Sequence, residues 1–429
     1  MKLAPARRIN GQLRLPGDKS ISHRSALIAA LASGSSEISN FSTARDCAAT
    51  IGCLQDLGIS VERQNRKLLF AGGQTLTQPS KPLDCGNSGT TLRILTGVLA
   101  GHDLTAELAG DESLSSRPMR RVIEPLELMG AKIQATSGKA PLKIRGSRNL
   151  APITYKLPVA SAQVKSAILF AGLNAEGRTT VIEPSRSRDH TERLFNGFGV
   201  PVTTSADLAV ALDGPGRFTG GSITIPGDIS SAAYFIAAAM LLPGSQLTIE
   251  AVGLNPTRAA FLSVLSSWGG DISTTGLQTA RNEPYGTINV RGGITRIAGD
   301  KERTLRQSMI PSLIDELPLL AVVGSQIEGG IRIHDAGELR VKESDRLAGT
   351  AANLRAMGAE VEEFDDGLSV LGPAPLRGAS IDSHGDHRIA MAFSVAALIA
   401  DGETEIGGSE CVAISFPEFF GLLESLVVR

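Results

Sequence analysis

The sequence has few cysteines, few aromatic residues and no long apolar run. Its four cysteines, Cys47, Cys53, Cys85 and Cys411, form no C-x-x-C pair, so we expect reduced thiols rather than disulfides. Residues 1–17 lack the apolar core of a signal peptide, and no run of about 18 uncharged apolar residues could span a membrane. These absences predict a cytoplasmic protein that makes no membrane contact.

The chain also lacks a surplus of charge of one sign. Among its 429 residues, 42 Lys and Arg stand against 44 Asp and Glu, which gives a net charge of −2. Nucleic-acid and anionic-membrane partners usually need a basic surplus, so we expect no nucleic acid as partner. With aromatic residues at 4% and 47 glycines, the core must be built from small aliphatic side chains and many tight turns.

Apolar segments that follow small polar residues recur six times along the chain. Each is rich in small apolar residues, which predicts a helix buried on all sides. Units of about 70 residues fit the length, and repeats of this kind bury their faces against one another. The helices are expected to start near Ser20, Ser88, Ala162, Ser230, Asp315 and Asp386.

A second, amphipathic helix follows in five of these repeats. Four of the five segments end in Leu, Met or Trp followed by Gly, as expected of a C-cap glycine. Residues that alternate in a strand-like pattern come next. The repeat is therefore predicted to be β-α-β-α-β-β. Six buried helices then need two clusters of three or one closed ring.

Comparison of two repeats with similar first residues distinguishes residues that the fold needs from residues that are available for binding or catalysis. LPGDKSISHR and IPGDISSAAY share Pro, Gly and Asp, which are typical of turns and N-caps. In the second repeat Lys19 and Arg24 are replaced by Ile229 and Tyr234, so the scaffold itself requires no cations there. Cations at a helix N-terminus are unfavourable unless an anion neutralises them. The segment predicts an oxyanion or phosphate site, with a solvated cap as the alternative.

Polar and cationic groups gather at other helix starts in the first half. GNSGTTLR is a turn that suits backbone approach to an anion, but it lacks the spacing of a nucleotide P-loop. SSRPMRR is expected to start a helix with Pro118 in its first position. SAQVKS is typical of a hydroxyl and phosphate reader. The candidate residues are Gly89, Arg117, Arg120, Arg121, Ser161, Gln163, Lys165, Arg186 and Arg188.

The second half adds carboxylates beside further cations. Each such segment alone is as typical of helix capping or of a solvated helix start. The H-x-x-H of HGDHR would allow two metal ligands, but no matching Cys/His cluster exists elsewhere, so we expect no metal. If the helix starts converge, they suit a small, multiply anionic substrate and acid–base chemistry. The groups are Asp315, Glu316, Arg340, Lys342, Glu343, Asp345, Arg346, Asp386, His387 and Arg388.

The motifs that carry these residues resemble one known family. In order, LPGDKSISHRS, GNSGTTLR, RPM, SAQVKSA, RDHTE, IDELP, ELRVKESDRL, DHRIAMAF and SFPEF resemble 5-enolpyruvylshikimate-3-phosphate synthases, and SAQVKS resembles their class II bacterial form. The resemblance covers nearly the whole chain. It implies an α/β fold of two domains, each with three β-α-β-α-β-β units around buried parallel helices. Domain one would hold residues 1–17 and 227–429 and domain two residues 18–226, with hinges near Gly17 and Gly227.

The resemblance also implies a reaction. The enolpyruvyl group of phosphoenolpyruvate would move to the 5-hydroxyl of shikimate 3-phosphate, releasing phosphate, in the pathway to chorismate and the aromatic amino acids. Protonation of the enol methylene would precede attack by the hydroxyl, and the tetrahedral adduct would then lose phosphate. No cofactor is needed. Glyphosate is expected to compete with phosphoenolpyruvate, and we expect a monomer.

Residue by residue, the resemblance assigns roles to the helix starts. Asp315 is the expected base toward the 5-hydroxyl and Glu343 the expected proton donor, although the sequence leaves open which acid serves which step. Lys19 would contact both substrates. Shikimate 3-phosphate would be held by Lys19, Ser20, Arg24, Ser161, Ala162, Gln163, Arg188, Asp315 and Lys342, and phosphoenolpyruvate by Lys19, Gly89, Arg117, Gln163, Arg346 and Arg388.

One departure and two rival interpretations accompany this resemblance. Many family members have a Lys before the final S/T-F-P, where this chain has Ile414, so a phosphate contact is lost or supplied by another residue. The related UDP-N-acetylglucosamine enolpyruvyl transferases carry a Cys shortly before an R-P dipeptide, whereas GDESLSSRP has none. A non-catalytic anion-binding or nucleic-acid-binding module is disfavoured by the charge balance, and it would leave Asp315 and Glu343 without a use.

Overall fold

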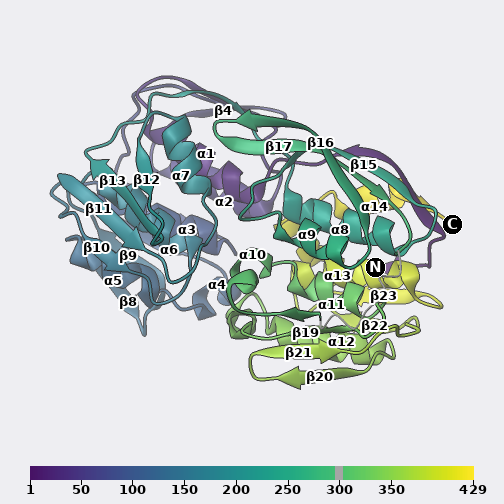
Figure 1. Cartoon of the computed structure of the whole chain (residues 1–429). Helices are drawn as coiled ribbons and strands as arrows, with labels where there is room; N and C mark the ends of the chain where they lie inside the picture. The colour runs from purple at the N-terminus through teal and green to yellow at the C-terminus, as the bar shows by residue number, and fades with distance from the viewer. Residues whose placement is uncertain (295–302) are drawn as a thin grey trace. The chain divides into compact units, whose positions relative to one another are not determined.

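The chain forms two compact α/β units, each described here by itself. The computed structural model describes residues 1–294 and 303–429. Unit 1 contains Met1–Leu15, Gly227–Gln278 and Pro284–Arg429, and unit 2 contains Pro16–Pro226 and Thr279–Glu283 (Figure 1). Among the described residues the chain therefore passes from one unit to the other at four points.

Unit 2 holds one four-stranded sheet for each of the first three repeats. In each sheet the first two strands run parallel and the other pairs are antiparallel, as a β-α-β-α-β-β unit requires. In sheet order the strands are β14 (Gly221–Thr224), β3 (Ser36–Ser39), β5 (Lys67–Phe70) and β4 (Val61–Gln64); β6 (Leu83–Asp84), β7 (Thr105–Ala109), β9 (Lys139–Arg145) and β8 (Lys132–Thr136); and β10 (Thr154–Lys156), β11 (Gly177–Ile182), β13 (Ala209–Gly214) and β12 (Val202–Thr204).

Unit 1 repeats this pattern with two changes at its chain ends. Strand β2, from the start of the chain, supplies the parallel strand of one sheet, which β24 extends, and β1 takes the place of a hairpin in another. In sheet order the strands are β16 (Asp271–Ala280), β17 (Glu283–Arg291), β15 (Gln246–Gly253), β2 (Arg8–Arg14) and β24 (Val427–Val428); β18 (Thr304–Leu305), β19 (Ile331–Ile333), β21 (Gly367–Val370) and β20 (Val361–Phe364); and β1 (Lys2–Leu3), β23 (Thr404–Gly407) and β22 (Ser380–Asp382).

Each unit packs its sheets around three almost fully buried helices, as the six apolar segments predicted. In unit 2, α3 contacts both α1 and α6; in unit 1, α8, α11 and α13 contact one another and lie together in Figure 1. Side chains cap the first N–H groups of five of these helices, whereas α11 has no side-chain cap among the described residues. The helices are α1 (Lys19–Leu31), α3 (Gly89–Ala100), α6 (Ala162–Gly172), α8 (Ile229–Leu241), α11 (Leu317–Gly324) and α13 (His387–Ile399).

The amphipathic helices end as their sequences predict. The last apolar residue of each is buried, and the glycine after it has a φ between +84° and +110°. These helices and their glycines are α2 (Arg45–Asp56) with Gly58, α5 (Arg120–Leu128) with Gly130, α7 (His190–Gly197) with Gly199, α9 (Ala260–Ser267) with Gly269 and α12 (Arg346–Ala356) with Gly358. The shorter elements are α4 (Glu112–Ser116), α10 (Ile310–Leu313), α14 (Phe419–Leu426), η1 (Gln307–Met309), η2 (Gly337–Val341) and η3 (Ser409–Ile414).

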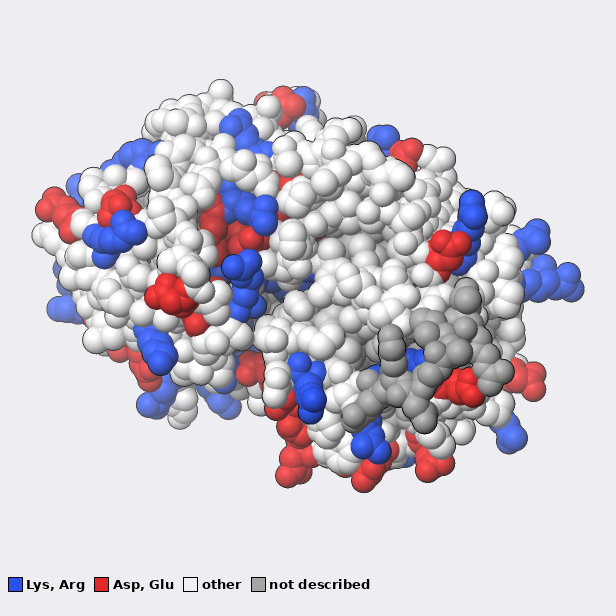
Figure 2. Space-filling view, viewed as in Figure 1, with Lys and Arg blue, Asp and Glu red and all other residues white. Residues whose placement is uncertain are grey.

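The visible surface carries charges of both signs. Figure 2 shows Lys and Arg side chains interspersed with Asp and Glu over this face. The four cysteines are free and buried. Within the described ranges, no helix is both long and apolar enough to cross a membrane.

Helices α3 and α6 approach each other closely at Gly97, so this position should tolerate no larger side chain. A Cβ on Gly97 would lie 2.2 Å from the carbonyl oxygen of Ala167, whereas a Cβ on Gly52 in α2 meets no atom within 4 Å. Gly97→Ala should therefore lower the free energy of unfolding by about 1–3 kcal/mol through overpacking. Gly52→Ala should raise it by up to about 1 kcal/mol, because alanine is the better helix former. Chemical denaturation of both variants checks this, and equal shifts would contradict it.

Candidate active site

The first turn of α1 presents Lys19 beside a carboxylate. Asp18 caps the helix, its side chain accepting the backbone N–H of Ile21 at 2.9 Å. Lys19 is the first helical residue, and its Nζ lies 2.8 Å from Oδ2 of Asp46 in α2. The Lys19 side chain keeps 19% of its surface exposed, so its ammonium is partly neutralised yet accessible to a ligand.

Arg24, one turn further along α1, is a buried cation held by neutral acceptors. Its guanidinium donates to Thr191 Oγ1 at 2.7 Å, Ser166 Oγ at 2.8 Å and the carbonyl of Ser20 at 2.9 Å. Among the described residues Arg24 forms no ion pair. Burial lowers the pKa of Arg24 to about 10, Glu192 raises it and the charge of Arg188 lowers it. A buried cation in this setting is stabilised by a bound anion.

The starts of α3 and α6 meet through a glutamine. Gln163 accepts from Arg93 Nη1 at 2.7 Å and donates to Thr90 Oγ1 at 2.9 Å. Ser161 caps α6, and Ala162 is its first residue. Because Arg24 also joins α1 to α6 through Ser166, the structure brings the three helix starts of unit 2 together.

Arg117 lies next to the start of α3. Its Nη2 donates to Asn87 Oδ1 at 2.7 Å and to Ser113 Oγ at 3.1 Å, and a Cβ on Gly89 would lie 3.4 Å from its Nη1. Arg117 follows α4 directly as its C-cap. The expectation that Pro118 takes the first position of the next helix is wrong, because α5 begins at Arg120.

Arg346 organises the candidate site of unit 1. It is the first residue of α12, and only 2% of its side chain is exposed. Its guanidinium lies 2.7 Å from Asp386, 2.6 Å from Glu343 and 3.4 Å from Asp315. Burial alone would lower the pKa of Arg346, but the three carboxylates together raise it. Two candidate acid–base residues, Asp315 and Glu343, are thus held on one guanidinium.

Arg388, in the first turn of α13, reaches the same carboxylates. Its Nη2 lies 3.7 Å from Asp315 and its Nη1 3.5 Å from Glu316, and it donates to Ser230 Oγ. Tyr234 lies 3.5 Å away, and burial raises the pKa of this phenol to about 12. The structure therefore brings the predicted acid–base residues and both predicted arginines of unit 1 together.

Lys342 adjoins this group. Burial lowers the pKa of Lys342, and the nearby charge of Asp315 raises it in part. At Ile414, where a lysine was expected from the resemblance, an aliphatic side chain packs against the core of unit 1.

Two arginines near the site were missed by sequence reasoning. Arg258 is 3% exposed, and its guanidinium lies 3.5 Å from Asp315 and 3.8 Å from Asp228. It precedes α9 in a segment without any motif, so the sequence offered no signal. Arg93 stands four residues after Gly89 in α3, and this spacing could have placed it on the same helix face.

Several charged candidates serve the scaffold instead. Lys165 is buried between Glu183 and Glu192, so the expectation that it reads substrate directly is wrong. Asp345 caps α12 and pairs with Arg340 at 2.8 Å. Arg120 and Arg186 are exposed, and Arg121 is partly buried. In residues 1–294 and 303–429 no cluster of three or more His, Cys, Asp or Glu side chains could hold a metal ion.

Solved structures place the fold in a known class. The enolpyruvyl transferase NikO from Streptomyces tendae superposes with a TM-score of 0.80 over 99% of this chain and 96% of its own, at 18% identity, which shows the shared fold. EPSP synthase from Acinetobacter baumannii superposes with a TM-score of 0.88 at 39% identity, covering 100% and 98% of the two chains. The predicted two-domain enolpyruvyl transferase fold is thereby confirmed.

Sequence comparison identifies the family. The family model for EPSP synthase (3-phosphoshikimate 1-carboxyvinyltransferase) matches residues 3–423. A 3-phosphoshikimate 1-carboxyvinyltransferase from Koribacter versatilis is 50% identical over 100% of this chain and 99% of its own length. One from Synechocystis sp. is 49% identical over 97% and 93%. The chain belongs to the EPSP synthase family, which confirms the resemblance.

Arg346 is a buried counterion as well as a candidate binding residue, so its loss should also destabilise the fold. Arg346→Met would leave Asp386, which is fully buried, without its counterion, so we expect a loss of about 3–5 kcal/mol in the free energy of unfolding. Arg355→Met, in the last turn of the same helix, removes a side chain that is 46% exposed and should cost less than about 1 kcal/mol. Urea unfolding of both variants measures this difference, and similar losses would contradict it.

Proposed function

We propose that this chain transfers the enolpyruvyl group of phosphoenolpyruvate to the 5-hydroxyl of shikimate 3-phosphate and releases phosphate. The observation that carries this proposal is the family match over residues 3–423, together with full-length relatives that share about half of the sequence and are named for this activity. The product would serve the pathway to chorismate and the aromatic amino acids. Four free, buried cysteines are in keeping with a cytoplasmic enzyme, and the monomeric state stays a prediction.

Shikimate 3-phosphate is assigned to the converging helix starts of unit 2 and to two residues of unit 1. The buried Arg24, with its neutral acceptors, supports an anion at this position. Capped helix N-termini at Ser161 and Asp18 add free N–H groups and a partial positive charge. The proposed ligand groups are Lys19, Ser20, Arg24, Ser161, Ala162, Gln163, Arg188, Asp315 and Lys342.

Phosphoenolpyruvate carries a carboxylate and a phosphate, both of which suit arginine. Guanidinium groups bind such anions through paired hydrogen bonds. The start of α3, where Gly89 leaves room beside Arg117, supports close approach of this ligand. The proposed groups are Lys19, Gly89, Arg117, Gln163, Arg346 and Arg388. Because both ligand sets draw on both units, we propose that domains 1–17 with 227–429 and 18–226 turn about hinges near Gly17 and Gly227.

The carboxylates supply the proton transfers. Glu343 gives a proton to the methylene carbon of phosphoenolpyruvate, and the adjacent carbon becomes an oxocarbenium-like centre. Asp315 takes the proton from the 5-hydroxyl as its oxygen bonds to that centre. The tetrahedral adduct then loses phosphate, which takes the hydroxyl proton from Asp315, and a methyl proton, which returns to Glu343, so that the enol double bond is restored. The contact of both acids with Arg346 supports their action on one substrate because it holds them as neighbours.

A phosphate-release assay tests the reaction. With phosphoenolpyruvate and shikimate 3-phosphate together, the enzyme should release phosphate continuously, and omitting either one should stop it. UDP-N-acetylglucosamine as acceptor should give none. Release with the UDP-sugar, or none with shikimate 3-phosphate, would refute the proposal.

Lys19 and Ile229 provide a matched pair of variants. Both are first residues of equivalent buried helices, α1 and α8. Lys19→Met should reduce phosphate release at least about 100-fold, because it removes a cation from both ligands. Ile229→Met should change kcat by less than about twofold, since a swap of similar volume is well tolerated. Thermal unfolding of both variants separates lost chemistry from lost folding. Equal activity of the two variants would contradict the role of Lys19.

Gly89 sets the expected response to glyphosate. Glyphosate should inhibit competitively with phosphoenolpyruvate. A Cβ in Gly89→Ala would lie 2.8 Å from Arg93 Nη1, whose end would have to shift, and 3.4 Å from Arg117 Nη1, where it would fill the space beside the guanidinium. This variant should raise KM for phosphoenolpyruvate and Ki for glyphosate, with KM for shikimate 3-phosphate unchanged. Gly52→Ala should leave all three constants unchanged. Inhibition that phosphoenolpyruvate does not relieve would count against this assignment.

A further inference from the structure

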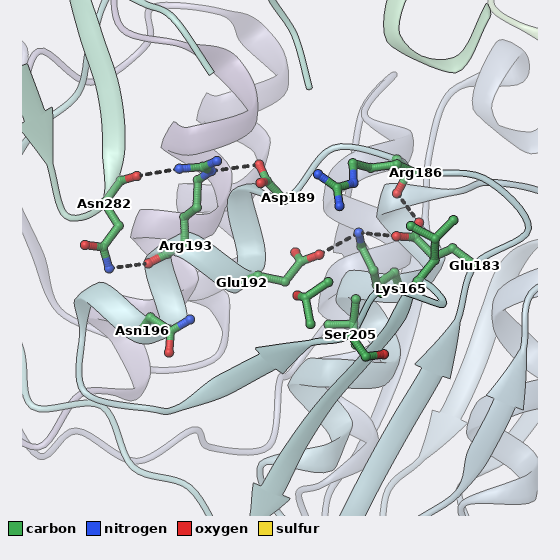
Figure 3. Close-up of a pocket in the computed structure, with 14 residues that line it drawn as sticks. Lys165, Glu183, Arg186, Asp189, Glu192, Arg193, Asn196, Ser205 and Asn282 are labelled. Carbon is green, nitrogen blue, oxygen red and sulfur yellow. Dashed lines mark hydrogen bonds and ion pairs between the residues drawn. The ribbon is translucent and has the colours of Figure 1, made fainter. Parts of the chain in front are cut away.

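Lys165 lies in a buried cluster that the proposed chemistry does not use. The cluster sits at a pocket of about 580 Å³ in unit 2 that is also lined by Glu183, Glu192, Arg186 and Asp189 (Figure 3). The Lys165 side chain is 1% exposed, and its Nζ lies 2.8 Å from Glu183 and 2.6 Å from Glu192. Its ammonium is thus committed to two carboxylates and is not free to bind substrate.

The two glutamates stand at opposite ends of the loop that carries Arg188. Glu183 directly follows β11, and Glu192 lies in the first turn of α7. Glu183 also accepts a hydrogen bond from Ser187, the residue before Arg188. Lys165 therefore ties both ends of the loop to α6, as the dashed contacts of Figure 3 show.

The same turn of α7 links this cluster to the buried cation of α1. Thr191, next to Glu192, accepts a hydrogen bond from Arg24 Nε at 2.7 Å. Arg188 lies near enough for its charge to lower the pKa of Arg24, while the charge of Glu192 raises it. Displacement of either loop end would change the spacing of the two arginines assigned to shikimate 3-phosphate.

Loss of the lysine charge would disturb this loop strongly. Glu192 is 6% exposed, and its Oε2 has no hydrogen-bond partner within the described part of the chain. Burial raises the pKa of Glu192, and the Lys165 ammonium, 2.6 Å away, offsets this rise in part. Without Lys165, two buried carboxylates would repel each other or take up protons.

We propose that Lys165 is a positioning residue: by bridging Glu183 and Glu192 it fixes the 183–192 loop so that Arg188 is placed for shikimate 3-phosphate. This inference rests on the proposed function of Arg188. It assigns Lys165 no contact with either substrate. Loss of Lys165 should therefore weaken the binding of shikimate 3-phosphate alone, and only while Arg188 is present.

A double-mutant cycle of Lys165 and Arg188 tests whether Lys165 acts through Arg188. Lys165→Met should raise KM for shikimate 3-phosphate about tenfold or more, with kcat and KM for phosphoenolpyruvate within about twofold. Arg188→Ala should raise the same KM. In the Arg188→Ala background, Lys165→Met should add less than about twofold, because residues that act through one another are not additive.

Two further variants keep the test decisive. Glu192→Gln retains an acceptor for Lys165 but removes one charge; it should raise KM for shikimate 3-phosphate about threefold, again only when Arg188 is present. Glu192→Gln takes the place of Lys165→Met in the test if Lys165→Met does not fold. Lys67→Met removes a lysine from an exposed pair with Glu37, 2.8 Å apart and about 40% exposed, and should leave every constant within about twofold.

Each outcome decides the inference. Unchanged KM in Lys165→Met and in Glu192→Gln overturns it, and so do equal increases with and without Arg188, which would show a general structural role. An unchanged KM in Arg188→Ala also overturns it. Failure of the proposed function would look different, because the parent enzyme itself would then release no phosphate with shikimate 3-phosphate.

Discussion

A helix buried on all sides must satisfy its N-terminal N–H groups without water, and this constraint organises both units. Side-chain caps meet it at Asp18, Ser88, Ser161, Asp228 and Asp386, each accepting a backbone N–H of its own first turn. The first-turn N–H groups left over carry the partial positive charge of each helix. Five of the six buried helices begin with this cap, so the repeated fold offers several candidate anion-binding positions.

Equivalent helix starts of the repeated scaffold carry different side chains, and the proposed function depends on these differences. The first residue is Lys19 in α1 but Ile229 in α8, although both helices are capped by an Asp and bury most of their residues. In unit 1 the carboxylate that caps α13, Asp386, also holds Arg346, which in turn holds Asp315 and Glu343. Asp386 thus both caps a helix and holds the arginine that contacts the two proposed acid–base residues, which fixes their position relative to the helix start.

Sequence reasoning succeeded where the signal is local. Apolar runs without a polar face identified the six buried helices, and the glycines after Leu57 and Met357 marked helix ends because only a residue tolerant of positive φ fits there. It failed where a partner is distant along the chain. Lys165 looked like a phosphate reader because Ser161 and Gln163 precede it, yet Glu183 and Glu192 bury it, and Arg258 reaches Asp315 from a segment with no motif.

The sequence by itself determined the α/β repeat, the helix caps and the residue types at each helix start, and its motifs pointed to the family. These features depend on neighbours within one or two helical turns, where spacing dictates geometry. The tertiary structure alone decided which cations are paired and which keep neutral partners: Lys165 and Arg346 lie among carboxylates, whereas Arg24 meets hydroxyls and a carbonyl. That distinction depends on which distant segments pack together, because Coulomb interactions follow distance in space rather than position in the chain.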